Sequence, residues 1–230
     1  MQNEPAIFYQ DIMGPELGLA YWELAGELFT LSNIYADCAY LFGEKSEDRV
    51  KLLNKTAPRF FRKVQLTFEN ELLLGLCRLT DPAQDRKKNN LSVKKLTELY
   101  NRGKPQADAH IESIAEKATR SADFARDWRN RWLAHKDYDL SLNNLSVSAL
   151  EPATLGKIDA ALAAVDDTLK AVMSAHKFSS AGFRNISDYG AAPSLASLLH
   201  EGLLARDLRN KRAESGNSTD EDLALLSYQP

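Results

Sequence analysis

The stretch PELGLAYWELAGELFTLSNIYADCAYLFG, residues 15–43, indicates the fold class of this chain. Its apolar side chains recur at the three- and four-residue spacing of one face of an α-helix. They are Leu17, Tyr21, Leu24, Leu28, Leu31, Ile34, Tyr35, Cys38 and Leu41. Pro15 at the start and Gly43 after the last apolar residue are typical helix boundaries. These features predict one amphipathic helix over the whole stretch.

The same spacing predicts more helices on both sides of the chain's midpoint. A short helical turn is expected after Ser46, and a long helix begins near Pro58 and ends at Asp81-Pro82, because the residue before a proline is disfavoured in helical geometry. Ser92 caps a further short helix. The last three helices are expected over residues 105–135 with a break near residue 121, from residue 152 onward, and over residues 193–212. Residues 137–152 are predicted to be a loop or a small hairpin.

This pattern predicts an all-α fold, an antiparallel helical bundle with a C-terminal helical extension. The 230 residues are enough for one large domain without disulfides or metal to stabilise it. We expect a helical domain over residues 1–176. Residues 177–230 are then a linker, an amphipathic helix and a flexible tail.

Charge and cysteine content exclude several classes of protein. The net charge of -3 argues against coating nucleic acid by bulk electrostatics, so any RNA contact must be local. Cys38 and Cys77, the two cysteines, lie in apolar helical patterns and are expected to be buried thiols in a reducing cytoplasm. No signal peptide and no apolar run of membrane-spanning length is found, so neither secretion nor membrane insertion is expected.

The stretch RDWRNRWLAHKD, residues 126–137, combines arginines, tryptophans and a histidine. At about 100° per residue, a regular helix places four side chains in one narrow stripe. They are Phe124, Trp128, Trp132 and His135. Arg129 lies about 120° from His135 on such a helix, so the two side chains converge only at a helix break or across a two-fold axis. The alternative is a histidine at the edge of the core, with the arginines as solvated helix charges.

Arg129-Asn130, four intervening residues and His135 resemble the motif of the HEPN superfamily, in which an arginine and a polar residue precede a histidine. Ala134 and Asp137, on either side of the histidine, resemble the AbiU-type branch of abortive-infection HEPN proteins. The blocks Leu79-Thr80-Asp81-Pro82 and Asn90-Leu91-Ser92 also look like that branch. The resemblance covers residues 22–173 and implies a helical bundle of HEPN type.

The resemblance implies a metal-independent endoribonuclease without a cofactor. His135 suits proton transfer, because its ordinary pKa of about 6.5 leaves both protonation states available near neutral pH. Arg129 is the expected clamp on the phosphate, and Asn130 holds a phosphate oxygen or orients His135. Further residues are expected to contact the RNA backbone (Arg126, Arg131 and Lys136) or to orient His135 (Asp127 and Asp137).

The family's partners are implied in the same way. RNA is the expected substrate, cleaved by attack of the 2'-hydroxyl to leave a 2',3'-cyclic phosphate and a 5'-hydroxyl. Two copies of the chain are expected to face each other across a composite site. A role in phage defence or in a toxin-antitoxin-like system, with a neutralising partner protein, follows from the same resemblance.

Two other readings remain open. His135, Asp137 and Asp139 form a small polar cluster that suggests a metal-dependent nuclease, although hard cations usually need several converging carboxylates. A HEPN module that binds RNA or a nucleotide, or another defence protein, without cleaving RNA is the second. A leucine stripe over residues 195–208 could dock on another chain or pack on the parent bundle.

Overall fold

The computed structural model of the protein describes residues 4–43, 47–85, 88–134, 142, 148–178, 182–183 and 191–227. In chain order, the helices are α1 (Glu4–Met13), α2 (Pro15–Phe42), α3 (Glu47–Thr56), α4 (Pro58–Thr80), α5 (Val93–Asn101), α6 (Ala109–Ser121), α7 (Asp123–Trp128), η1 (Arg129–Leu133), α9 (Leu155–Ala175), α10 (Ala191–Glu214) and α11 (Asp220–Ser227). Two very short strands, β1 (Gln84–Asp85) and β2 (Lys88–Asn89), pair antiparallel. The predicted all-α class is confirmed.

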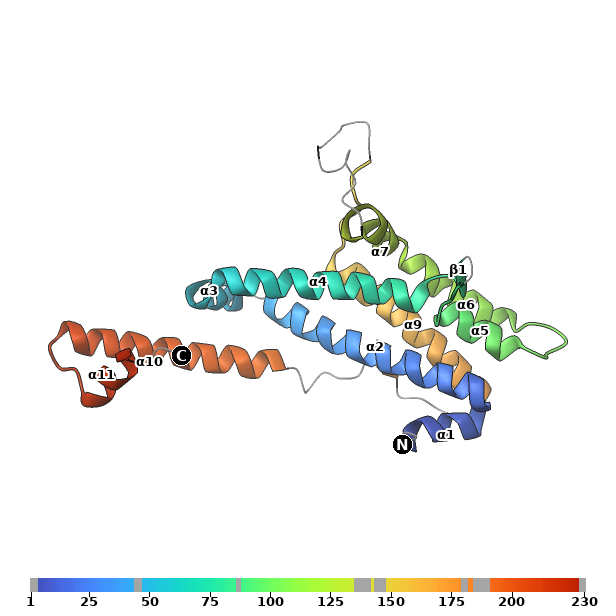
Figure 1. Ribbon diagram of the computed structural model, residues 1–230, viewed down its shortest axis with the longest axis horizontal. Coiled ribbons are helices and arrows are strands. Elements are labelled where there is room, and N and C mark those ends of the chain that lie inside the picture. Colours follow the sequence, from blue (N-terminus) through green and yellow to red (C-terminus); the bar gives the residue numbers. More distant parts are fainter. Residues whose placement is uncertain are drawn as a thin grey trace.

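The bundle is built around α2, α4 and α9, which pack against one another. α2 runs antiparallel to α4 and to α9 (Figure 1), as the short connection through α3 requires. α5 and α6 cover the end of the bundle where α2 begins and α4 ends. α7 and η1 leave this bundle at the C-terminal half of α4 and project to one side.

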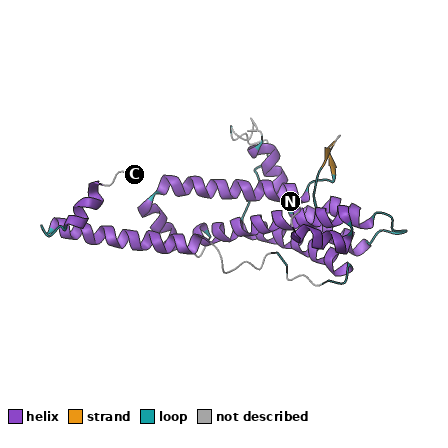
Figure 2. Ribbon diagram, turned by 60° about the horizontal axis from the view of Figure 1, so that its bottom comes forward, coloured by secondary structure: helices purple, strands orange, loops and turns teal. Residues whose placement is uncertain are grey.

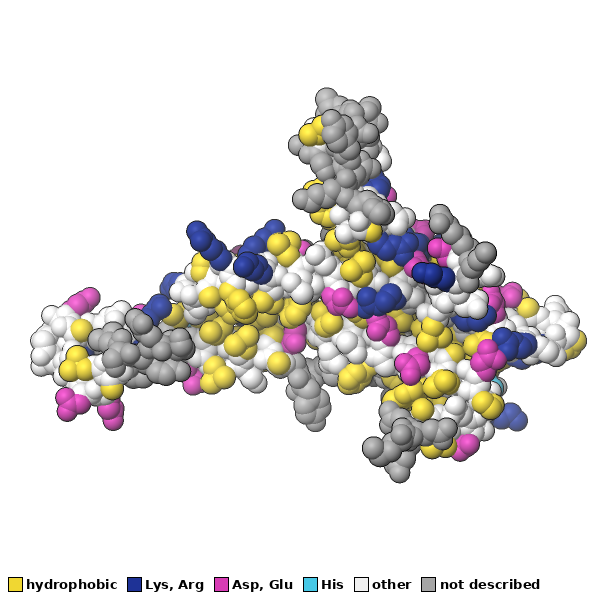
Figure 3. All heavy atoms as spheres, in the orientation of Figure 1, with side chains coloured by type: hydrophobic (Ala, Val, Ile, Leu, Met, Phe, Trp, Pro, Cys, Tyr) yellow, Lys and Arg dark blue, Asp and Glu magenta, His cyan; other side chains and the backbone are white. Residues whose placement is uncertain are grey.

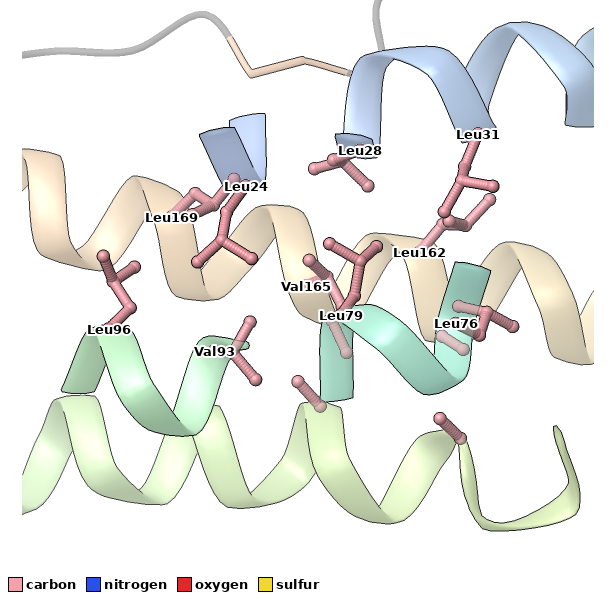
Figure 4. Close-up of a cluster of buried hydrophobic side chains, with 14 of the residues drawn as sticks. Leu24, Leu28, Leu31, Leu76, Leu79, Val93, Leu96, Leu162, Val165 and Leu169 are labelled. Atoms are coloured by element: carbon pink, nitrogen blue, oxygen red, sulfur yellow. The ribbon is translucent and has the colours of Figure 1, made fainter. Parts of the chain in front are cut away.

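The core draws on α2, α4, α5, α6 and α9, and the side chains labelled in Figure 4 are branched aliphatic residues of α2, α4, α5 and α9. α2 and α9 contribute most of them, with α4 and α5 closing the remaining sides. The labelled core residues are Leu24, Leu28, Leu31, Leu76, Leu79, Val93, Leu96, Leu162, Val165 and Leu169. All ten are at most 2% exposed, so apolar burial is the main stabilising contribution here.

Several predicted helix boundaries are confirmed. α2 begins at Pro15 and ends before Gly43, and α4 begins at Pro58 and ends before Asp81-Pro82. The hydroxyl of Ser92 accepts a hydrogen bond from the backbone N–H of Lys95 at 3.4 Å, which caps α5 as expected.

Other boundaries differ from the sequence prediction. Residues 105–108 precede α6 instead of opening it, because the Asp108 carboxylate accepts hydrogen bonds from the N–H groups of His110 and Ile111 and so caps the helix. The later helix likewise begins at Leu155, capped by Thr154. α1, which the apolar spacing did not reveal, packs on α2, and α11 stands where only a tail was expected.

Among the described residues, α10 packs on the bundle through its first turns. Ala192 and Ala196 are its buried residues, and the Ala192 N–H donates to Asp37 Oδ1 at 3.1 Å. Beyond them the helix extends past α3 (Figures 1 and 2), with Leu198, Leu204 and Leu208 more than half exposed. None of the described helices has the length and apolar character needed to cross a membrane.

Candidate functional site

The segment that carries the predicted motif changes its helical geometry at Arg129. α7 is α-helical up to Trp128, and residues 129–133 then form a π-helix, closed by a 2.9 Å hydrogen bond from the Ala134 N–H to the Arg129 carbonyl. The even 100° spacing assumed from the sequence therefore does not hold across the motif. Short π-helical turns occur frequently at functional sites, where they redirect individual side chains.

Arg129 forms an ion pair with Asp81, which lies 48 residues earlier in the chain. Its Nη1 is 2.6 Å from Asp81 Oδ2, and the two side chains are only 28% and 20% exposed. Asp81 is the residue that ends α4, and its own N–H donates to the Cys77 carbonyl at 2.8 Å. The structure thus joins the Leu79-Thr80-Asp81-Pro82 block to the arginine of the motif.

Asn130 holds the same guanidinium from a second side. Its Oδ1 accepts a hydrogen bond from Arg129 Nε at 3.1 Å. Asp81 and Asn130 therefore fix the plane of the guanidinium, while Nη2 donates to no residue within the described part of the chain. Of the two, Asn130 is exposed and Asp81 is half-buried.

Arg126, predicted to contact RNA, is directed into the protein. Its guanidinium donates to the Thr80 hydroxyl at 2.9 Å, to the Thr119 carbonyl and to the Asp123 carboxylate. The side chain is only 17% exposed. These contacts fasten α7 to the ends of α4 and α6.

Arg131 also makes contacts within the protein. Its Nη1 pairs with Asp127 Oδ2 at 3.2 Å, and its Nη2 donates to the Ser148 carbonyl at 2.6 Å. Trp128 Nε1 donates to the Glu151 carbonyl at 2.7 Å. Together, Arg131 and Trp128 hold residues 148–151 against α7 and η1.

Cys77 lies close to the charged end of α4. Burial raises the pKa of its thiol to about 11, and the positive charge of Arg129 offsets only part of that increase. Cys77 is a free, buried cysteine. It therefore stays protonated near neutral pH and is a packing residue, not a nucleophile.

His135, Lys136, Asp137 and Asp139 lie outside the residues that the structure describes. The described residues consequently include the arginine and asparagine of the motif but not its histidine. Among the described residues, no group of three or more His, Cys, Asp or Glu side chains could hold a metal ion.

Comparison with known families gives a match to the model of the family HEPN_AbiU2 (AbiU2) over residues 15–192. The match covers most of the chain. The chain belongs to the AbiU2 family of HEPN proteins. No significant match was found among curated proteins or solved structures.

The region matched to AbiU2 runs from the first residue of α2 to the first residues of α10. It contains both blocks that form the Arg129–Asp81 pair. Most of α10 and all of α11 lie beyond it. The part of this AbiU2 chain that projects past α3 therefore lies outside the matched region.

Asp81 was not among the predicted site residues, although its position at the end of a helix was a signal. A carboxylate at the C-terminal end of a helix faces the negative end of the helix dipole, an unfavourable position that calls for a nearby cation. Arg129 supplies that cation. Which cation pairs with Asp81 depends on how α7 crosses α4, and spacing along the chain does not contain that information.

Proposed function

We propose that this AbiU2 protein is a metal-independent endoribonuclease, with Arg129, Asn130 and His135 as its catalytic residues. The observation that carries the proposal is the Arg129 guanidinium, fixed by Asp81 and Asn130 and still 28% exposed. A guanidinium fixed in this way offers its remaining N–H donors to phosphate oxygens without further reorganisation. Membership of the AbiU2 family of HEPN proteins supports the same assignment.

In this mechanism the 2'-oxygen of a ribose attacks the adjacent phosphorus, and the bond to the 5'-oxygen breaks. A neutral His135 accepts the proton of the 2'-hydroxyl, and a protonated His135 gives a proton to the leaving 5'-oxygen. Arg129 stabilises the negative charge that grows on the phosphate oxygens. The products are a 2',3'-cyclic phosphate and a 5'-hydroxyl, and the mechanism needs no metal.

Two copies of the chain supply the two histidines. A homodimer with its motifs facing across a two-fold axis places one His135 as the base and the other as the acid. Lys136 and the exposed face of α4 add local positive charge for the RNA backbone, and Asp137 orients His135. The biological setting proposed for this activity is phage defence or a toxin-antitoxin-like system in the cytoplasm, with a partner protein that neutralises it.

One observation favours a non-catalytic RNA-binding module instead. Asp81 already neutralises part of the charge on Arg129, and Arg126 and Arg131 make their hydrogen bonds within the protein. A guanidinium paired in this way can hold a phosphate without driving its cleavage.

The deciding experiment incubates the full-length protein with mixed RNAs in EDTA. Wild type should produce fragments ending in 2',3'-cyclic phosphate, whereas Arg129→Ala and His135→Ala should lose the activity and still bind RNA. Equal cleavage by all three proteins would remove the site assignment. Binding without cleavage by wild type would establish the non-catalytic module.

A further inference from the structure

A cavity of about 650 Å³ lies next to the motif, between α4, η1 and the residues that precede α9. This volume is within the range of roughly 300–1,000 Å³ that small-molecule sites occupy. Its lining residues are Arg62, Leu66, Glu69, Asn70, Leu73, Trp128, Trp132, Leu150, Ala153 and Ile158. Apolar and aromatic walls with a few polar groups on one side are typical of a binding site for a flat, partly polar ligand.

The walls of this cavity are held in place by hydrogen bonds. Trp128 Nε1 and Arg131 Nη2 donate to the Glu151 and Ser148 carbonyls, which fixes the wall containing Leu150. Trp132 is 39% exposed and lines the cavity. A base stacked on an indole ring gains favourable free energy whichever base it is.

The polar side of the cavity presents hydrogen-bond acceptors and donors. Gln65 accepts from Arg62 at 3.0 Å and donates to Glu69 Oε1 at 2.9 Å. These two hydrogen bonds orient the Glu69 carboxylate. Its Oε2 accepts no hydrogen bond from any residue that the structure describes. Asn70, one residue further, adds an exposed amide.

Positive charge lies along the approach to the cavity. Arg59, Arg62 and Lys63 are exposed on the first turns of α4, and Figure 3 shows Lys and Arg side chains gathered over that end of the helix. Residues 58–68 contain no acidic side chain. This end of α4 therefore suits a phosphodiester backbone, even though the whole chain has a net charge of -3.

The cavity lies within reach of Arg129. Trp128 and Trp132, which line it, stand on either side of Arg129 in the sequence. Along α4, Leu73 in the cavity wall and Asp81 at the guanidinium are eight residues apart, ~12 Å of helix. A short single strand of RNA can span that distance, with a phosphate at Arg129 and a neighbouring base in the cavity.

We propose that this cavity binds one unpaired nucleobase of the RNA, stacked on Trp132, with guanine preferred through Glu69 and Asn70. Guanine presents two adjacent N–H donors that a carboxylate can accept and a carbonyl oxygen that an amide can bind. Adenine presents no such pair of donors. This base site rests on the proposed function, because the base would be recognised beside the same Arg129 that holds the phosphate.

The test measures binding of fluorescently labelled five-nucleotide DNAs to the full-length protein. DNA lacks the 2'-hydroxyl and so cannot be cleaved by the proposed mechanism. A thymidine pentamer with one central guanine should bind at least about fivefold more tightly than the same pentamer with adenine or thymine at the centre. Equal affinity for the three pentamers overturns the proposal.

The variants separate stacking from base recognition. Trp132→Ala should weaken binding of the guanine pentamer about 10-fold, and Trp132→Phe, which keeps a ring, should largely restore it. Glu69→Gln should remove the preference for guanine over adenine. Trp22→Phe, on the α1 side of α2, is the matched control and should change neither affinity nor preference. Unchanged binding by Trp132→Ala, with its helical circular dichroism intact, also overturns the proposal.

Failure of this proposal and failure of the ribonuclease proposal give different results. Arg129→Ala should lose RNA cleavage and keep the preference for the guanine pentamer. A guanine preference in a protein that cleaves no RNA supports the cavity assignment and removes only the nuclease. Cleavage of RNA by a protein with no base preference in binding removes the cavity assignment and leaves the nuclease.

Discussion

Arg129 and Asp81 form a 2.6 Å ion pair between η1 and the C-terminal end of α4. The pair connects two sequence blocks that lie 48 residues apart. Because Asp81 ends its helix at a proline, its carboxylate is held where α7 passes over α4. The guanidinium is thus positioned by α4, a helix of the core, as well as by η1.

Replacing Asp81 with asparagine should reduce RNA cleavage more than RNA binding. Asn keeps the size of the side chain and removes the charge, so Arg129 loses its fixed plane. A misplaced catalytic group costs about 100-fold in rate, and we expect a loss of about 10- to 100-fold in kcat.

Cleavage rates under single-turnover conditions check this expectation, together with RNA affinity. Asp123→Asn is the control, because Asp123 is 69% exposed and pairs with Arg126 instead. A variant at Asp81 with the wild-type rate would show that this ion pair plays no part in catalysis.

Replacing Arg126 should destabilise the protein. Its guanidinium satisfies the carbonyl of Thr119 and the hydroxyl of the fully buried Thr80. The Thr119 carbonyl keeps its bond from the Ala122 N–H, and the Thr80 hydroxyl keeps its bond to the Leu76 carbonyl, but both lose the charged donor. Hydrogen bonds to a charged group contribute about 2 kcal/mol, so Arg126→Ala should lower the free energy of unfolding by about that amount.

Urea unfolding measures this change. Arg120→Ala, a substitution at an exposed position near the end of α6, serves as the comparison and should change stability by less than about 0.5 kcal/mol. Wild-type stability of Arg126→Ala combined with weaker RNA binding would favour the original prediction that Arg126 contacts RNA.

Two glycines on α2 should respond in opposite ways to alanine. A Cβ at Gly18 would stand 2.3 Å from the Tyr9 carbonyl oxygen, so the backbones of α1 and α2 would have to separate. At Gly26, which is exposed, a Cβ would meet nothing within 4 Å. Gly18→Ala should therefore lower the melting temperature.

Gly26→Ala should raise the melting temperature slightly, because alanine is favoured over glycine in a helix interior by about 1 kcal/mol. Thermal unfolding followed by circular dichroism compares the two variants with wild type. A rise in melting temperature for both would mean that α1 does not pack closely on α2.

Acidification should weaken the protein partly through His176. Burial, with a smaller contribution from the charge of Lys104, lowers the pKa of His176 in the folded state below its ordinary 6.5. The unfolded chain therefore binds this proton first as the pH falls. The stability contributed by neutral His176 is complete above pH 6.5 and is lost as the pH falls towards the folded-state pKa.

His176→Phe removes the titrating group and keeps a ring beside Tyr100, which His176 contacts edge to face. The loss of stability between pH 7.5 and pH 5.5 should be smaller in this variant than in wild type, as measured by urea unfolding. His110→Gln, at an exposed position, should show the full wild-type loss. Identical pH dependence in all three proteins would exclude this role of His176.

The sequence alone determined the fold class and most of the helix positions. Pro15 and Gly43, Pro58 and Asp81-Pro82, and the Ser92 cap act on the backbone within a few residues, so their effects can be read locally. Apolar spacing then indicated which faces turn inward. The predicted beginning of α6 at Pro105 was wrong. Pro105 and Asp108 can both stand at the start of a helix, and the hydrogen bonds that make Asp108 the cap are not visible in the residue pattern.

The sequence also indicated the family, since Arg129-Asn130 and His135 lie close together along the chain and form a recognisable motif. The surroundings of Arg126 and Arg129 became visible only in the folded chain. Asp81, which pairs with Arg129, Thr80, which pairs with Arg126, and the cavity beside Trp132 come from distant segments, and their contacts depend on how the α7–η1 segment crosses α4. Local backbone preferences act over a few residues, whereas such contacts are set by the packing of whole helices.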